Sequence, residues 1–163
     1  MVTKTELYAL DLSSFTNTVE SLDDQLRANR EKLDDIAHAK EIISSSLEGQ
    51  SAQAMIAKLD ALEQKITAHI TSIQQTQAAI TTYRTNKQQL QRNVIDSVNR
   101  IELADYDVSD TWRVRPSHRL LNILSPTKIG AKFLAAIKMQ VQLLALVNTF
   151  DRYDLQAAIN SGG

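Results

Sequence analysis

The chain has 163 residues, which is enough for one domain or for a terminal module of a longer protein. Hydrophobic residues make up 43% and charged residues 23%, so a folded core is expected rather than wholesale disorder. Aromatic residues are only 5%, with 4 glycines and 2 prolines, and this composition favours an all-α fold over a sheet fold. The net charge of -1 gives no global indication of nucleic-acid binding, and the absence of cysteine excludes disulfides and thiolate chemistry.

The first ten residues lack the basic start and apolar centre of a secretory signal peptide. No window reaches about 18 uninterrupted apolar residues, so no ordinary transmembrane helix is expected. If the protein is exported, we expect a route that needs no cleaved signal.

A first long helix is predicted over about 11–46, because its core positions recur at alternating spacings of three and four residues. This heptad pattern is typical of coiled coils and helical bundles. The core positions are Leu12, Phe15, Val19, Leu22, Leu26, Asn29, Leu33, Ile36, Lys40, Ile43 and Leu47.

A second long helix is predicted over about 52–104 by the same spacing. Its first core positions are Ala52, Met55, Leu59, Leu62, Ile66, His69, Ile73, Thr76 and Ile80. Gly49 separates the two helices, and a glycine at a helix end can adopt the left-handed conformation without steric cost. Ser51 is the expected N-cap of the second helix.

Folding the chain at Gly49 brings the two heptad registers into agreement, which predicts a long antiparallel helical hairpin. The same register sets Asn29 opposite His69 as one polar layer. We interpret this layer as a device that fixes the register rather than as a ligand or proton site. Residues 88–104 extend beyond the first helix and need another partner, either the lead-in before Asp11 or the C-terminal third.

The C-terminal segment has a different character. Residues 105–110 form an acidic connector, residues 112–116 precede or include a proline and are expected to be extended, and helical structure is predicted over about 117–159. The predicted division is therefore a helical hairpin over 1–104 and a C-terminal helical segment over 105–163, packed on the hairpin or on a partner. The long helix within this segment, 126–150, carries apolar residues on more than one side.

Six basic residues and no acidic residue occur between Thr111 and Phe150. They are Arg113, Arg115, Arg119, Lys128, Lys132 and Lys138. We expect this basic face to pack on the acidic first half of the chain. A membrane surface or an anionic partner, contacted through 126–150, is the alternative, and nucleic acid is not expected.

Catalytic and cofactor motifs are not apparent in this sequence. There is no glycine-rich phosphate loop, no zinc-binding His-Glu-x-x-His and no Gly-x-Ser-x-Gly nucleophile motif. The three histidines are far apart, and the adjacent aspartates diverge on a helix surface. We therefore expect a non-catalytic protein without a metal or cofactor.

The hairpin and its tight turn Leu47-Glu48-Gly49 resemble the LXG domain, the targeting module of toxins secreted by the type VII system of Gram-positive bacteria. The residues from Ser46 to Met55 are similar to the family's Leu-x-Gly followed by small residues that open a helix. The resemblance covers about residues 11–104, and Leu47 and Gly49 carry its turn motif. It implies a WXG-like helical hairpin that is secreted without a cleaved signal peptide and is cytoplasmic before export.

The resemblance also implies an export signal, an aromatic residue followed four residues later by an acid on a helix. Phe150 with Asp154 is the preferred match, because it closes the long third helix. Tyr106 with Asp110 is the alternative match, and it lies in the predicted connector.

The partners implied by the resemblance are one or more small helical proteins and the secretion machinery. A partner hairpin would complete a four-helix bundle and cover apolar residues outside the seam, expected to include Ile42, Ile56 and Ile70. Self-association stays open. The other functions left open are a generic coiled-coil structural protein of a phage or cell envelope, and a protein that acts at a membrane surface.

Overall fold

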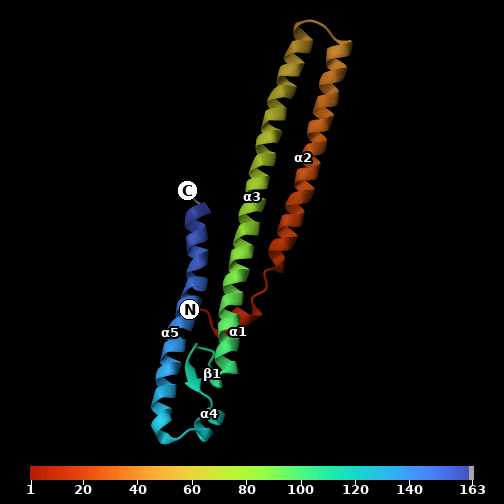
Figure 1. Ribbon diagram of the computed structural model, residues 1–163. Coiled ribbons are helices and arrows are strands. Elements are labelled where there is room, and N and C mark those ends of the chain that lie inside the picture. The colour runs from red at the N-terminus through yellow and green to blue at the C-terminus, as the bar shows by residue number, and fades with distance from the viewer. Residues whose placement is uncertain (162–163) are drawn as a thin grey trace. The chain divides into compact units, whose positions relative to one another are not determined.

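The computed structural model describes the backbone of residues 1–161 and the side chains of residues 1–154. It confirms the all-α fold, with long helices packed antiparallel and a long C-terminal helix. The helices are α1 (Lys4–Ala9), α2 (Ser13–Ser46), α3 (Gln50–Leu103), α4 (His118–Ile123) and α5 (Pro126–Ser161), and a short antiparallel pair, β1 (Tyr106–Val108) and β2 (Val114–Pro116), follows α3 (Figure 1).

The chain divides into two compact units, and the division falls within α3. The hairpin unit consists of Ser13–Thr82, which holds α2 and the first part of α3. The core unit consists of Met1–Leu12 with Tyr83–Gly163, and it holds α1, the rest of α3, both strands, α4 and α5.

In the hairpin unit, the register predicted for α2 is confirmed over most of its length. The buried residues of α2 are Leu26, Asn29, Ile36 and Ile43, all of which were assigned to the core. Leu47 differs, because it lies just beyond the end of α2 and is 48% exposed.

The register predicted for α3 is only half right. Ala52 and Ile73 are buried as expected, but Met55 and Leu62 are each 46% exposed. At four layers of the seam the half-buried residue of α3 is the one that follows the predicted core residue. These half-buried residues are Ile56, Glu63, Ile70 and Gln77. A spacing of four then three fits the facing helix as well as three then four, so both registers satisfy the heptad rule. The partner hairpin expected to cover Ile56 and Ile70 would therefore find them already in the seam, whereas Ile42 is 51% exposed.

Lys40 occupies a core position of α2 and reaches two carboxylates of α3. Its ammonium pairs with Asp60 and, at 2.6 Å, with Glu63. Glu63 belongs to the shifted register, so the charge of Lys40 is matched across the hairpin rather than directed into solvent.

In the core unit, the part of α3 beyond residue 82 packs against both partners left open by the sequence. One cluster of buried side chains joins Leu7 of α1 to Val94 and Val98 of α3 and to Leu143 and Val147 of α5, and all five have an exposed fraction of 0%. The lead-in before Asp11 is therefore the short helix α1, which Thr3 caps with Glu6 in a reciprocal capping box.

The connector between α3 and α5 contains the two strands, which the sequence analysis expected only as extended chain. Tyr106 and Val108 alternate with an exposed residue, as do Val114 and Pro116, so one face of the pair enters the core. The outer edge of β2 is closed, since the Val114 amide donates to the Gln140 side chain of α5 at 3.0 Å and Pro116 has no N–H.

The last two helices begin at residues that favour helix starts, a serine N-cap and a proline at the first helical position. Ser117 caps α4, accepting a hydrogen bond from the Leu120 amide, and α5 begins at Pro126. α5 runs without interruption to Ser161. Within it, the Asp151 carboxylate accepts hydrogen bonds from the Val2 amide, at 3.2 Å to one oxygen and 3.4 Å to the other.

One helix in the described part of the chain, Pro126–Asp154 of α5, is long and apolar enough to cross a membrane by length and composition. Its best window has a mean hydropathy of 1.4, and 22% of that window is buried. The buried share includes Ala136, Leu143 and Val147, which belong to the core of this unit. Most of this apolar window of α5 is therefore not buried in the core.

Candidate functional site

The predicted export signal on α5 lies against α3. Phe150 and Asp154 are one helical turn apart and therefore share a face of α5. The Phe150 side chain is 4% exposed, whereas the Asp154 side chain is 59% exposed. Both residues contact Lys87 of α3, so the structure brings Phe150 and Asp154 together around one ammonium group.

Lys87 is 4% exposed, and its ammonium has three partners. It donates a hydrogen bond to the Phe150 carbonyl oxygen at 2.8 Å and lies 3.1 Å from the Asp154 carboxylate. It also lies 3.7 Å from the centroid of the Phe150 ring, within the range of a cation–π contact. A buried ammonium is costly unless it is paired and hydrogen-bonded, and these contacts meet that condition.

Two tyrosines surround the exposed side of this site. Tyr83 donates a short hydrogen bond to the Asp154 carboxylate and stacks on Tyr153, with ring centroids 5.5 Å apart. The Tyr153 hydroxyl in turn accepts a hydrogen bond from the Asn86 amide at 2.8 Å. Burial raises the pKa of Tyr83 above its ordinary value of 10.0, and the Asp154 carboxylate raises it further. Tyr83 therefore stays protonated and continues to donate to Asp154.

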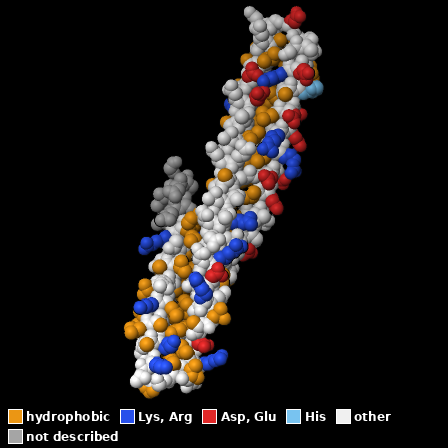
Figure 2. Space-filling view, viewed as in Figure 1, with side chains coloured by type: hydrophobic (Ala, Val, Ile, Leu, Met, Phe, Trp, Pro, Cys, Tyr) orange, Lys and Arg blue, Asp and Glu red, His pale blue; other side chains and the backbone are white. Residues whose placement is uncertain are grey.

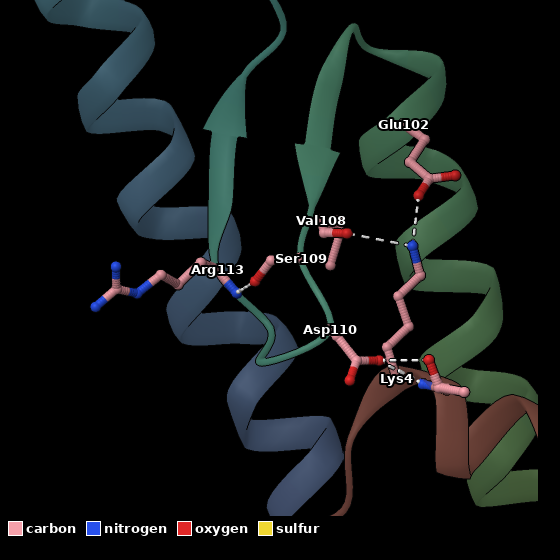
Figure 3. A network of polar contacts seen from close by, with 7 residues as sticks. Lys4, Glu102, Val108, Ser109, Asp110 and Arg113 are labelled. Carbon is pink, nitrogen blue, oxygen red and sulfur yellow. Dashed lines mark hydrogen bonds and ion pairs between the residues drawn. The ribbon is translucent and has the colours of Figure 1, made fainter.

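The alternative signal, Tyr106 with Asp110, is not on a helix. Tyr106 is in β1, with 4% of its side chain exposed, and Asp110 is in the turn that follows this strand. The Asp110 carboxylate accepts hydrogen bonds from the amide and the hydroxyl of Thr5, both at 2.7 Å. Asp110 thus fixes the first turn of α1 rather than standing free beside an aromatic ring (Figure 3).

Lys4 extends this network from α1 to α3. Its ammonium lies between the Glu102 carboxylate at 2.9 Å and the Val108 carbonyl oxygen at 3.2 Å (Figure 3). The Lys4 amide also donates to the Asp110 carbonyl oxygen at 2.9 Å. These contacts place Asp110 in a network that joins α1, β1 and α3, and its role with Tyr106 as the alternative export signal stays a prediction.

The pKa of Asp110 tests this network. The two hydrogen bonds from Thr5, first the hydroxyl and then the amide, hold the pKa of the Asp110 carboxyl below its ordinary value of 3.8, and Lys4 lowers it further. A depressed pKa stabilises the fold above pH 3.8, and this contribution is lost as the pH falls through the lower folded value. We expect Thr5→Val to raise the Asp110 pKa toward 3.8 in a carboxyl NMR titration. An unchanged pKa in this variant would show that the hydroxyl bond is not formed in solution.

The tip of the hairpin has the predicted conformation, and no side chain of the hairpin unit packs on Gly49. Gly49 has φ +92, in the left-handed region, and a Cβ built on it would meet nothing within 4 Å. Leu47 beside it is half exposed. The glycine is thus required by the backbone of the turn, as expected, and α3 begins at Gln50, so Ser51 lies inside the helix rather than capping it.

The polar layer predicted between Asn29 and His69 does not form. Asn29 is buried, but its amide donates to the Gln25 carbonyl oxygen of its own helix at 2.8 Å. His69 is exposed, because the shifted register of α3 puts Ile70 in the seam instead. Of the two residues predicted to form the polar layer, only Asn29 is buried in the hairpin.

The residues that the structure describes contain no group of three or more histidine, cysteine, aspartate or glutamate side chains that could hold a metal ion. The site around Lys87 offers one carboxylate, one ammonium and two phenols, which suit recognition by hydrogen bonds and ring contacts. That the chain is non-catalytic and has no cofactor stays a prediction.

Sequence reasoning missed Lys87 and Tyr83 as parts of the site. Lys87 continues the heptad spacing of the second predicted helix, seven residues after Ile80. The available signal was a lysine at a core position of a helix segment that had no facing helix in the hairpin. Such a lysine needs a carbonyl or carboxylate from elsewhere in the chain, and the end of α5 supplies both.

Comparisons with protein-family models, with curated proteins and with solved structures give no match to this chain.

Proposed function

We propose that this chain is a non-catalytic helical targeting module that directs export through a type VII secretion system of a Gram-positive bacterium. In this proposal it is secreted without a cleaved signal peptide, and it binds small helical partner proteins before export. The LXG-like turn at Leu47 and Gly49 and the antiparallel hairpin support this assignment. The observation that carries it is the pair Phe150 and Asp154, held on one face of α5 by Lys87.

The contacts of the pair suggest how the signal would be read. Asp154 is exposed and flanked by the stacked rings of Tyr83 and Tyr153, so a receptor can reach the carboxylate directly. Phe150 is buried under Lys87, so a receptor that needs this ring can bind it only after the end of α5 leaves α3. Lys87 thus sets the balance between a docked and a presented signal.

Secretion assays in a host with an intact type VII system test this function. We expect Asp154→Asn to reduce secretion to the level of a strain that lacks the system's ATPase, because the exposed carboxylate is lost as a recognition group. Asp96→Asn, which changes an exposed aspartate on α3, serves as the matched control and should be secreted like wild type.

Gly49→Ala addresses the turn separately. Alanine at φ +92 is strained, so this variant should loosen the tip and weaken export through the fold rather than through the signal. Equal secretion of wild type, Asp154→Asn and Gly49→Ala would contradict both site assignments. Secretion that survives deletion of the system would contradict the function itself.

Action at a membrane surface is the second candidate function. The specific observation in its favour is the mean hydropathy of 1.4 in α5, together with the basic residues that precede and interrupt this helix. Flotation with liposomes that depends on residues 126–150 would support it.

A further inference from the structure

The outer face of α5 is apolar, and no described residue of the core unit covers it. Leu134, Ile137 and Val141 are spaced by three and four residues and so share this face. Their side chains are 63%, 59% and 64% exposed, whereas Leu143 and Val147 on the core side are fully buried. Isolated exposed apolar residues are normal, but a stripe over successive turns of one helix marks a contact surface.

A groove of about 1210 Å³ adjoins this face, between α5 and the turn and strand before it. Phe133, next to Leu134 on α5 and 44% exposed, lines the groove together with Leu121 of α4 and Pro116 of β2. The apolar stripe and the groove, which is lined by both apolar and polar side chains, therefore form one continuous surface, which we call the α5 outer surface.

Basic side chains border this surface on both sides. Arg113, Arg115 and His118 line the groove, and Lys138 lies next to Ile137 on the far side of the stripe. Over α5 in the lower part of Figure 2, hydrophobic side chains lie beside Lys and Arg side chains. In Figure 3 the Arg113 side chain points away from the Lys4 network.

These charges are not matched within the core unit. None of the six basic residues between Thr111 and Phe150 forms an ion pair with a described residue of its own unit, and the groove lining includes only one acid, Asp107. The packing of this basic segment on acidic parts of the chain, expected from the sequence, is not seen in the core unit. The borders of the α5 outer surface thus remain available for negative charge from outside.

We propose that the α5 outer surface binds an amphipathic helix of a partner protein whose apolar stripe is flanked by acidic residues. This inference rests on the proposed function, because it places the helical partner at a particular surface. A stripe from Leu134 to Val141 and its neighbours matches the spacing at which one helix packs along another. Acidic residues beside the partner's stripe would meet Arg115 on one side and Lys138 on the other.

The α5 outer surface fits a partner helix better than it fits a second copy of this chain or an anionic lipid bilayer. A second copy packed face to face by a twofold axis would set Arg115 and Lys138 against basic residues of the same surface. A flat anionic bilayer would cover the stripe but cannot enter the groove beside Phe133. A helix with side chains of its own can fill both parts.

Two synthetic helical peptides with the same leucine stripe test the proposal, one flanked by glutamate and the other by lysine. Binding to the full chain is measured by fluorescence anisotropy of labelled peptide at low and high salt. We expect the glutamate peptide to bind at least ten-fold more tightly, a difference of about 1.4 kcal/mol, and to weaken as salt rises. Failure of both peptides to bind, or equal binding of both, would overturn the proposal.

Variants locate the binding surface. Ile137→Gln with Val141→Gln should abolish binding of the glutamate peptide without unfolding the chain, since both side chains are exposed. The matched control is Met55→Gln with Leu62→Gln, which changes two exposed apolar residues of the hairpin unit and should bind like wild type. Arg115→Glu with Lys138→Glu should reverse the preference toward the lysine peptide.

The remaining outcomes separate this inference from the proposed function. Loss of binding in the hairpin control but not in the α5 variant would overturn the α5 surface while leaving the secretion function intact. Binding to vesicles of anionic lipid without binding to the glutamate peptide would overturn it in favour of a membrane. Dimerisation of wild type that Ile137→Gln with Val141→Gln removes would overturn it in favour of a second copy.

Discussion

Replacement of Trp112 by alanine is expected to lower the free energy of unfolding by about 3–5 kcal/mol. Trp112 is 1% exposed and is the largest of the fully buried side chains. Its ring packs in the cluster that joins α1, α3, the strands and α5, and its indole N–H donates to the Val2 carbonyl oxygen at 2.7 Å. Alanine would lose both the packing and the hydrogen bond, and the cavity could not close without moving several elements. Urea denaturation followed by far-ultraviolet circular dichroism measures the change.

Two controls show which part of the loss comes from the core. Leu103→Ala removes an apolar side chain that is 86% exposed, so the free energy of unfolding should change by less than about 0.5 kcal/mol. Trp112→Phe keeps an aromatic ring but leaves the Val2 carbonyl oxygen without its donor, so its effect should fall between the other two. Equal midpoints for Trp112→Ala and Leu103→Ala would show that this tryptophan does not organise the core.

The hairpin illustrates how far periodicity can determine a register. On the first helix every predicted core position except Asn29 and Lys40 carries an apolar residue, and the burial observed on α2 agrees with this register. On α3 the competing registers have equal apolar content, with Met55 and Leu62 in one and Ile56 and Ile70 in the other. Only the facing helix decides between them, and Lys40 favours the register that brings Glu63 within 2.6 Å. Such a cross-helix pair is not visible in the period of either helix alone.

The strands show a different limit of the sequence. Tyr106, Val108 and Val114 alternate with polar residues, which is a strand signal, but each strand is only three residues long. The turn between them depends on a positive φ of 67 at Trp112, and the entry to β1 depends on a φ of 66 at Asp105. Neither residue type normally indicates the left-handed conformation as strongly as glycine does. The tight connection is imposed by burial of the Trp112 ring, a tertiary effect.

The candidate site combines a feature that the sequence predicts, the shared helix face of Phe150 and Asp154, with one that it does not, the contact with Lys87. The spacing of Phe150 and Asp154 predicted that they share a helix face, and this is confirmed by α5 running through both residues. Their contact with Lys87 could not be predicted, because the two helices meet only when α5 folds back on the end of α3. The sequence identifies the two residues of the pair, and tertiary packing adds the ammonium that holds them.

Lys87→Glu is expected to lower the free energy of unfolding by about 3–5 kcal/mol, because it leaves a buried charge without compensation. A carboxylate at this position would face the Phe150 carbonyl oxygen, the negative face of the Phe150 ring and the Asp154 carboxylate. Lys87→Met keeps a long flexible chain without charge and should cost only about 1–3 kcal/mol, the penalty for a carbonyl oxygen that loses its donor. Lys65→Glu, an exposed position of the same helix, should have little effect.

Combining Lys87→Glu with Asp154→Lys separates the ion pair from the other contacts of Lys87. If the pair accounts for the cost, the reversed charges attract and the double variant regains stability, with a coupling free energy of about 0.5–3 kcal/mol in a double-mutant cycle. Only part of the loss should return, since a glutamate cannot donate to the Phe150 carbonyl oxygen. A coupling of zero would mean that Lys87 is held by Phe150 alone. Asp154 would then be tied to α3 by the Tyr83 hydroxyl rather than by Lys87, and the proposed control of signal presentation by Lys87 would rest on Phe150 rather than on the acid.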